Sequence, residues 1–83
     1  MAPAFSQMPT LGEFIARARH YGYTKHTIRI PELGARLTYL RRVRGTAVEL
    51  VDLPPIHEGD RLTKTAMEDL CQRARIPAED FGL

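Results

Sequence analysis

The fold is decided by the middle of the chain, residues 25–53, which read KHTIRIPELGARLTYLRRVRGTAVELVDL. Polar and apolar residues alternate over 25–30 and again over 37–44, and this period of two is typical of a strand. Residues 46–53 are rich in β-branched and apolar residues and end at a proline pair, so they predict a third strand. Proline and glycine residues mark short turns between the three segments. Consecutive strands with short connections predict an antiparallel meander.

An amphipathic helix is expected on each side of these strands. Thr10 and Glu13 have the form of a capping box, and so do Thr65 and Glu68. Each box is followed by apolar residues at helical spacing, and Pro77 ends the second helix before a short terminal turn anchored by a phenylalanine. The two apolar stripes consist of Leu11, Phe14, Ile15 and Ala18, and of Met67, Leu70, Cys71 and Ala74.

These elements predict an α+β fold of order α-β-β-β-α, in which both helices pack on one face of a three-stranded antiparallel sheet. We expect a flexible tail at residues 1–9 and a single domain at 10–83, because a chain of 83 residues can hold only one modest core. A single cysteine cannot form an internal disulfide, and the histidines show no metal-ligand spacing, so neither metal nor cofactor is expected. No apolar run is long enough to cross a membrane, which predicts a cytoplasmic protein.

Charge is divided unevenly along the chain. Residues 1–45 carry eight Lys and Arg against two Glu, a net charge of +6, whereas 46–83 carry four against eight acidic residues, a net charge of −4. This asymmetry indicates either a surface for a polyanion or a solvated basic face that complements the acidic part of the same protein.

Strand alternation assigns these charges to faces of the sheet. If the helices cover the more apolar face, that face carries Ile28, Ile30, Leu37, Tyr39 and Val43, and Arg41 interrupts it. The opposite, open face then carries basic side chains suited to a phosphate backbone. The candidate nucleic-acid-binding residues are Lys25, Arg29, Arg36, Arg42 and Arg44.

Several short motifs carry a family resemblance. Pro55-Ile-His57-Glu-Gly59 follows the third strand, Thr65 opens the second helix, Ile76 followed by Glu79-Asp80-Phe81 closes the domain, and Gly22-Tyr23 follows the first helix. In these features the chain resembles the HicA (YcfA-like) toxins of bacterial HicA–HicB toxin–antitoxin pairs, whose fold is similar to the double-stranded-RNA-binding domain. The resemblance implies a metal-independent endoribonuclease that binds RNA, and a HicB-like antitoxin that covers the basic face.

The catalytic position departs from the family pattern. Those toxins place the catalytic histidine in a Gly-Ser-His at the start of a strand, where this chain has Gly34-Ala35-Arg36. Arginine stays protonated and cannot act as a general base. In a shifted register, His26 at the start of the first strand, beside Lys25, becomes the candidate catalytic residue, although it lacks the preceding Gly-Ser. The alternative is that His26 is a surface histidine at a strand end. The sequence thus leaves open an active mRNA interferase or a catalytically impaired relative.

A hypothesis from another class is a small non-catalytic protein-interaction or adaptor domain. Its bipolar charge would then serve docking to a partner or self-association into a homo-oligomer.

Overall fold

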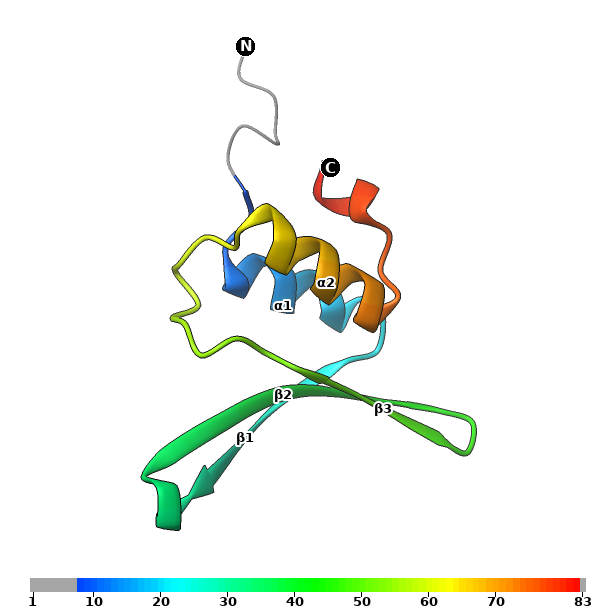
Figure 1. The fold of residues 1–83 in the computed structure, drawn as a ribbon. Coiled ribbons are helices and arrows are strands. Elements are labelled where there is room, and N and C mark those ends of the chain that lie inside the picture. Colours follow the sequence, from blue (N-terminus) through cyan, green and yellow to red (C-terminus); the bar gives the residue numbers. More distant parts are fainter. Residues whose placement is uncertain (1–7, 83) are drawn as a thin grey trace.

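The structure, a computed structural model, describes residues 8–82 and has two layers, a sheet and a pair of helices above it (Figure 1). The strands form an antiparallel meander of order β1-β2-β3, which confirms the predicted α+β fold and its α-β-β-β-α order. The elements are α1 (Leu11–Arg19), β1 (Thr24–Ile30), η2 (Pro31–Leu33), β2 (Ala35–Arg44), β3 (Ala47–Asp52), α2 (Lys64–Ala74) and η3 (Ala78–Phe81), the two η elements being short 3-10 helices.

The predicted tail falls mostly outside the described residues, which exclude 1–7. Met8 packs against the core, and the carbonyl oxygen of Pro9 accepts a hydrogen bond of 2.9 Å from the backbone N–H of Leu62. Met8 and Pro9, which the prediction assigned to the tail, therefore contact the folded domain.

The start of α1 confirms the predicted capping box and is also hydrogen-bonded to the loop between β3 and α2. The backbone N–H of Thr10 donates to Glu13 Oε1 at 2.7 Å, and the N–H of Glu13 donates to Thr10 Oγ1 at 3.1 Å. The two amides between them, those of Leu11 and Gly12, donate to the carbonyl oxygens of Asp60 at 2.9 Å and of Glu58 at 2.8 Å. The loop between β3 and α2 is thereby held against the first turn of α1.

The second helix begins earlier than predicted. Its N-cap is Thr63, whose Oγ1 accepts a hydrogen bond of 3.1 Å from the N–H of Ala66, so the prediction of a capping box at Thr65 is wrong. The earlier start places Leu62 and Met67, both buried, on either side of the first turn in the positions of a hydrophobic staple. The helix ends at Arg75 in the left-handed conformation, with φ of 58°, before the predicted stop at Pro77.

The core lies between the two helices and the centre of the sheet. Phe14 on α1 and Met67 on α2 are fully buried, as are Leu40 and Val51, which are partners on β2 and β3. Tyr23 is also buried, and its hydroxyl donates to the carbonyl oxygen of Ala74 at 2.9 Å, which ties the start of β1 to the end of α2. Cys71 belongs to this core, as its place in the apolar stripe predicted, and so does Phe81 of the terminal turn, which stacks on Phe14 with the ring centroids 5.6 Å apart.

The prediction of which sheet face packs on the helices is wrong. Leu40 and Val51 point to the helices, and residues an even number of positions from them along each strand share their face, here called the helix-side face. The opposite face, here called the outer face, carries the side chains that were expected in the core, namely Ile28, Ile30, Leu37, Tyr39 and Val43.

The physical reason is the small area that the helices cover. The two short helices lie over the middle of the sheet, while the β1–β2 hairpin extends beyond them on one side and the β2–β3 turn on the other (Figure 1). Only Leu40 and Val51, with Tyr23 and Leu53 just outside the strands, are needed to fill the space beneath the helices. Counting apolar residues along a whole strand therefore selects the wrong face.

Candidate nucleic-acid interface

Three of the five predicted basic residues lie together on the β1–β2 hairpin. Arg29 and Arg36 are direct cross-strand partners, and Lys25 is on the same, helix-side face of β1. All three are exposed: the hairpin end that carries Arg29 and Arg36 projects past the helices (Figure 1), whereas Lys25 lies opposite the buried Leu40. We call Lys25, Arg29 and Arg36 the hairpin cluster.

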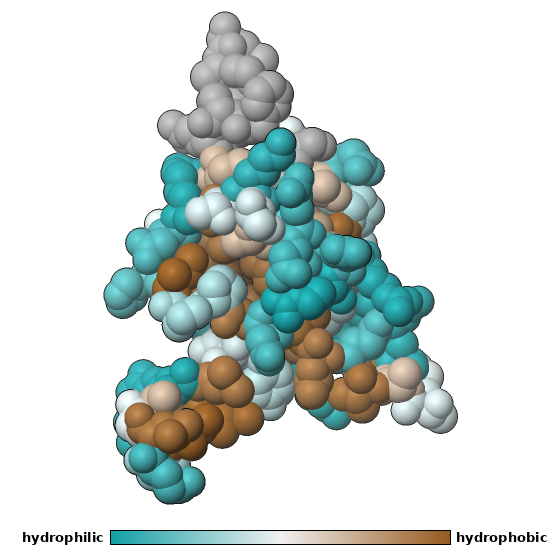
Figure 2. Space-filling view, in the orientation of Figure 1, coloured by the Kyte–Doolittle hydropathy of each residue, from teal (hydrophilic) through white to brown (hydrophobic). Residues whose placement is uncertain are grey.

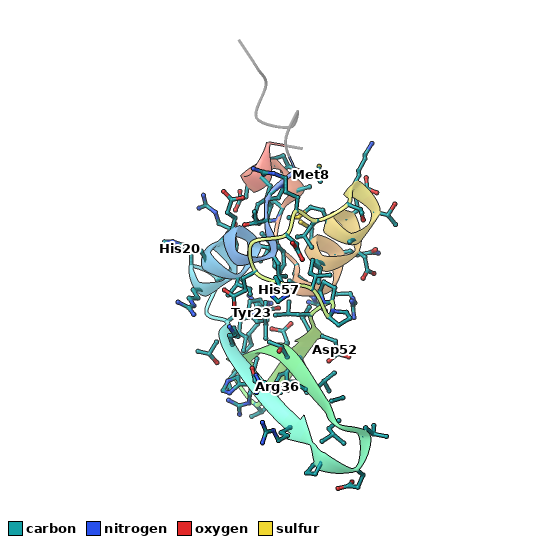
Figure 3. The ribbon with its side chains drawn as sticks, turned by 90° about the vertical axis from the view of Figure 1, so that its left-hand side faces the viewer. Met8, His20, Tyr23, Arg36, Asp52 and His57 are labelled. Atoms are coloured by element: carbon teal, nitrogen blue, oxygen red, sulfur yellow. The ribbon has the colours of Figure 1, made fainter. Side chains whose placement is uncertain are left out.

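Arg36 lies between two surface hollows that give the hairpin cluster its shape. One hollow, near the η2 turn, is lined by Arg29 and Arg36. The other separates the hairpin from the loop that follows β3 and is lined by Lys25 and Arg36 together with Glu58 of that loop. In Figure 3 Arg36 lies on the hairpin, well away from His20, which follows the end of α1.

Polar neighbours complete this surface. The hydroxyls of Thr27 and Thr38 lie between Lys25 and the arginine pair, with their oxygen atoms 3.5 Å apart. Glu58 forms an ion pair with Lys25. Glu58 was missed by sequence reasoning because 33 residues separate it from Lys25, and only the fold brings the two together.

The other two predicted residues, Arg42 and Arg44, are not part of this cluster. They lie on the helix-side face beyond Leu40, toward the β2–β3 turn, so the core separates them from the hairpin cluster. Arg42 Nε donates to Glu49 Oε1 at 2.8 Å, and Nη1 donates to the carbonyl oxygen of Tyr21 at 3.0 Å. Its guanidinium carbon lies 4.4 Å from the centre of the Tyr23 ring, a cation–π geometry. The Arg42 side chain therefore covers one end of the core, and its guanidinium is used in these contacts instead of being exposed to a ligand.

His26, the candidate catalytic residue, lies on the outer face, opposite the hairpin cluster. Its ring stacks on that of Tyr39, with centroids 5.4 Å apart, and its Nε2 is 2.8 Å from Thr24 Oγ1. Because the sheet separates His26 from Lys25, Arg29 and Arg36, a phosphate held by the hairpin cluster is out of its reach.

The remaining histidines are also outside the hairpin cluster. His20 caps the end of α1, and His57 lies in the loop after β3. The backbone N–H of His57 donates to Asp60 Oδ2 at 3.1 Å, and its carbonyl oxygen accepts from the N–H of Asp60 at 3.0 Å. His57 thus forms part of a turn.

Shifted pKa values occur away from the hairpin cluster. The hydrogen bond from Arg42 lowers the pKa of the Glu49 carboxyl, and the nearby charges of Arg44 and Arg75 act in the same direction. Burial raises the pKa of the Tyr23 hydroxyl and of the Cys71 thiol, because a low-dielectric surrounding disfavours the ionised form. These three groups belong to the core and its boundary.

Residues 8–82 contain neither a candidate metal site nor a candidate membrane-spanning helix. Across residues 8–82, no three His, Cys, Asp or Glu side chains gather in a way that could hold a metal ion. Within that range neither helix has the length and apolar character that crossing a membrane requires. No protein-family model, curated protein or solved structure matches the chain.

Proposed function

We propose that this protein is a HicA-like RNA-binding component of a toxin–antitoxin pair, acting in the cytoplasm, with the hairpin cluster as its phosphate-binding surface. The cross-strand pair of Arg29 and Arg36 carries this proposal. Like charges directly opposite each other destabilise a sheet, so such a pair is best accounted for by an anion that neutralises both. The adjacent threonine hydroxyls supply neutral donors for phosphate or ribose oxygens.

We further propose that the chain binds RNA without cleaving it. The hairpin cluster has Arg36 where the resembled family has a histidine, and a guanidinium can hold a phosphate but cannot take a proton from a 2′-hydroxyl. His26 lies across the sheet from this surface. A HicB-like antitoxin would cover the hairpin cluster, where its acidic side chains would compete with RNA.

The binding test is the salt dependence of affinity for a short unstructured RNA labelled with fluorescein, measured by anisotropy. Three cations that each contact a phosphate of single-stranded RNA predict a slope of about −2 when log affinity is plotted against log salt concentration. Each alanine substitution is expected to reduce the magnitude of this slope by ~0.7. Arg29→Ala and Arg36→Ala are each expected to weaken binding about tenfold at low salt. Arg19→Ala is the matched control, because it removes one exposed positive charge on α1, away from the hairpin.

Two results would overturn this part of the proposal. One is binding that does not depend on salt, and the other is an equal loss of affinity in Arg19→Ala. Either would place the interaction outside the hairpin cluster.

Cleavage is tested separately with the same RNA. Wild type and His26→Ala are both expected to leave it intact, and Arg36→His is a gain-of-function probe that puts an imidazole opposite Arg29, in the hollow that Lys25 also lines. Cleavage by wild type that disappears in His26→Ala would refute the assignment of a non-cleaving protein.

A protein-docking role is favoured by a different observation, the exposed aliphatic side chains of the outer face. This face and the hairpin cluster are on opposite sides of the sheet, so the two roles do not compete for surface. Absence of RNA binding in the anisotropy assay would leave docking as the function.

A further inference from the structure

The outer face of the sheet presents an apolar surface that nothing within residues 8–82 covers. Figure 2 shows hydrophobic residues on the hairpin at the lower left and along the lower side of the sheet. Five aliphatic side chains from all three strands are between 42% and 61% exposed there, and they lie on both sides of the central Tyr39 and Arg41. They are Ile28, Leu37, Val43, Val48 and Leu50.

This surface is large enough to be an interaction site. Five side chains of this kind leave on the order of 400 Å² of apolar area in one region, which is comparable to the largest apolar patch on a typical monomeric protein. Antiparallel sheets normally expose a polar face to water, whereas here the exposed face is the more apolar of the two. Such a face indicates a protein–protein interface.

The charges on the outer face indicate which partner fits it. Arg41 and Asp52 are its two charged residues among the described strands, apart from the titratable His26. Arg41 pairs across the ladder with Leu50, two positions from Asp52, so the cation and the anion are diagonal neighbours at the centre. Both side chains are exposed, and neither takes part in an ion pair within residues 8–82.

A surface with one central charge of each sign, flanked by aliphatic side chains, is complementary to itself. A two-fold axis through the centre sets Arg41 of each copy against Asp52 of the other, so that two ion pairs form and no like charges meet. A strongly acidic or basic partner would leave one of the two charges opposed by its own sign. The helix-side face differs in this respect, since Lys25, Arg29 and Arg36 give it a strong positive excess.

We infer that the outer face is the interface of a symmetric homodimer, in which two sheets pack face to face. Sheets packed in this way lie about 10 Å apart, and their inner side chains interdigitate. With the polar side chains of the same face included, the two copies together would bury on the order of 1,200 Å², the lower end of the range for specific interfaces. The hairpin cluster of each copy remains on the outside of the dimer.

The experiment is sedimentation equilibrium of the full chain over a wide concentration range. Wild type is expected to dimerise with a micromolar dissociation constant. Leu50→Lys is expected to weaken dimerisation at least tenfold, and because Leu50 is 61% exposed the substitution removes little packing from the monomer. Ile56→Lys is the matched control, since it adds the same charge at an exposed aliphatic residue of the loop after β3.

A charge exchange tests the geometry. Arg41→Asp and Asp52→Arg are each expected to weaken the dimer, because each opposes like charges across the axis, and the double variant is expected to restore it. A folded wild type that stays monomeric at 200 μM, or a double variant no better than either single one, would overturn the inference. Measuring both properties of each variant distinguishes failure of the dimer from failure of the proposed RNA binding. In the anisotropy assay Leu50→Lys is expected to bind RNA as wild type does, and in sedimentation Arg36→Ala is expected to dimerise as wild type does.

Discussion

Replacing Arg42 with alanine is predicted to destabilise the fold strongly while leaving the hairpin cluster in place. The Arg42 side chain is only 10% exposed, donates to Glu49 and to the carbonyl oxygen of Tyr21, and lies over the ring of Tyr23. In the sequence it is indistinguishable from its neighbour Arg44, which is 57% exposed and lies 3.9 Å from Glu49.

The expected magnitude follows from these contacts. A partly desolvated cation–π contact contributes about 1–2 kcal/mol. The hydrogen bond from the charged guanidinium to the carbonyl oxygen of Tyr21 contributes about 1.5 kcal/mol. We leave the ion pair with Glu49 out of this sum, because Arg44 and Arg75 both lie 3.9 Å from the same carboxylate and can replace part of it. The loss is therefore about 3 kcal/mol, which corresponds to a fall in Tm of roughly 12–24 °C for a domain of this size.

The assay is urea and thermal unfolding followed by circular dichroism. Arg44→Ala is the control, since it removes the same charge from the same strand and is expected to change the free energy of unfolding by less than about 0.5 kcal/mol. RNA affinity, measured at a temperature where Arg42→Ala is still folded, is expected to stay within about twofold of wild type. Equal stability of the two variants, or a loss of RNA affinity in Arg42→Ala as large as that in Arg36→Ala, would refute the structural role of Arg42.

Three further predictions concern the core and its boundary. Arg75→Gly is expected to raise the free energy of unfolding by about 0.5–1 kcal/mol in urea, because glycine adopts the left-handed conformation without steric strain; a destabilised variant would contradict this. The Cys71 thiol is expected to react with Ellman's reagent only at the rate of unfolding, because it is buried and burial raises its pKa. Fast labelling of the native protein would contradict the burial of Cys71. Because the folded protein lowers the pKa of Glu49, its contribution is present above the unfolded pKa and is lost as the pH falls through the folded value. Wild type should therefore lose more stability below about pH 5 than Glu49→Gln does in urea titrations, and parallel profiles would argue against this.

Features set by neighbouring residues could be predicted from the sequence. The capping box at Thr10 and Glu13, the apolar stripe of α1 and the order of strands all follow from patterns within a few residues, and each is confirmed. The alternation along β1 and β2 also correctly grouped Lys25 with Arg29 on one face.

Features set by distant packing could not be predicted. Alternation divides a strand into two faces, but it does not say which face the helices cover, and here the covered area is small and centred on Leu40. The difference between Arg36, which is exposed, and Arg42, which is half-buried, has the same origin, because it depends on where Tyr23 meets the sheet. A single-residue change of register would exchange the faces of every strand, so these placements depend on the whole fold.

The contact between Glu58 and Lys25 has a consequence for selectivity. The carboxylate of Glu58 occupies Lys25 before any nucleic acid arrives, and the carbonyl oxygen of the same residue is held by the first turn of α1. In the proposed RNA-binding role, the Glu58 carboxylate competes with an incoming phosphate for Lys25, and the backbone bond to α1 keeps Glu58 close to that lysine. An isolated anion has to displace Glu58 from Lys25 by itself. A chain of phosphates that is already bound to Arg29 and Arg36 presents its next phosphate to Lys25 at high local concentration. Such an arrangement favours polymeric anions over small ones, and it does so without any contact to a base.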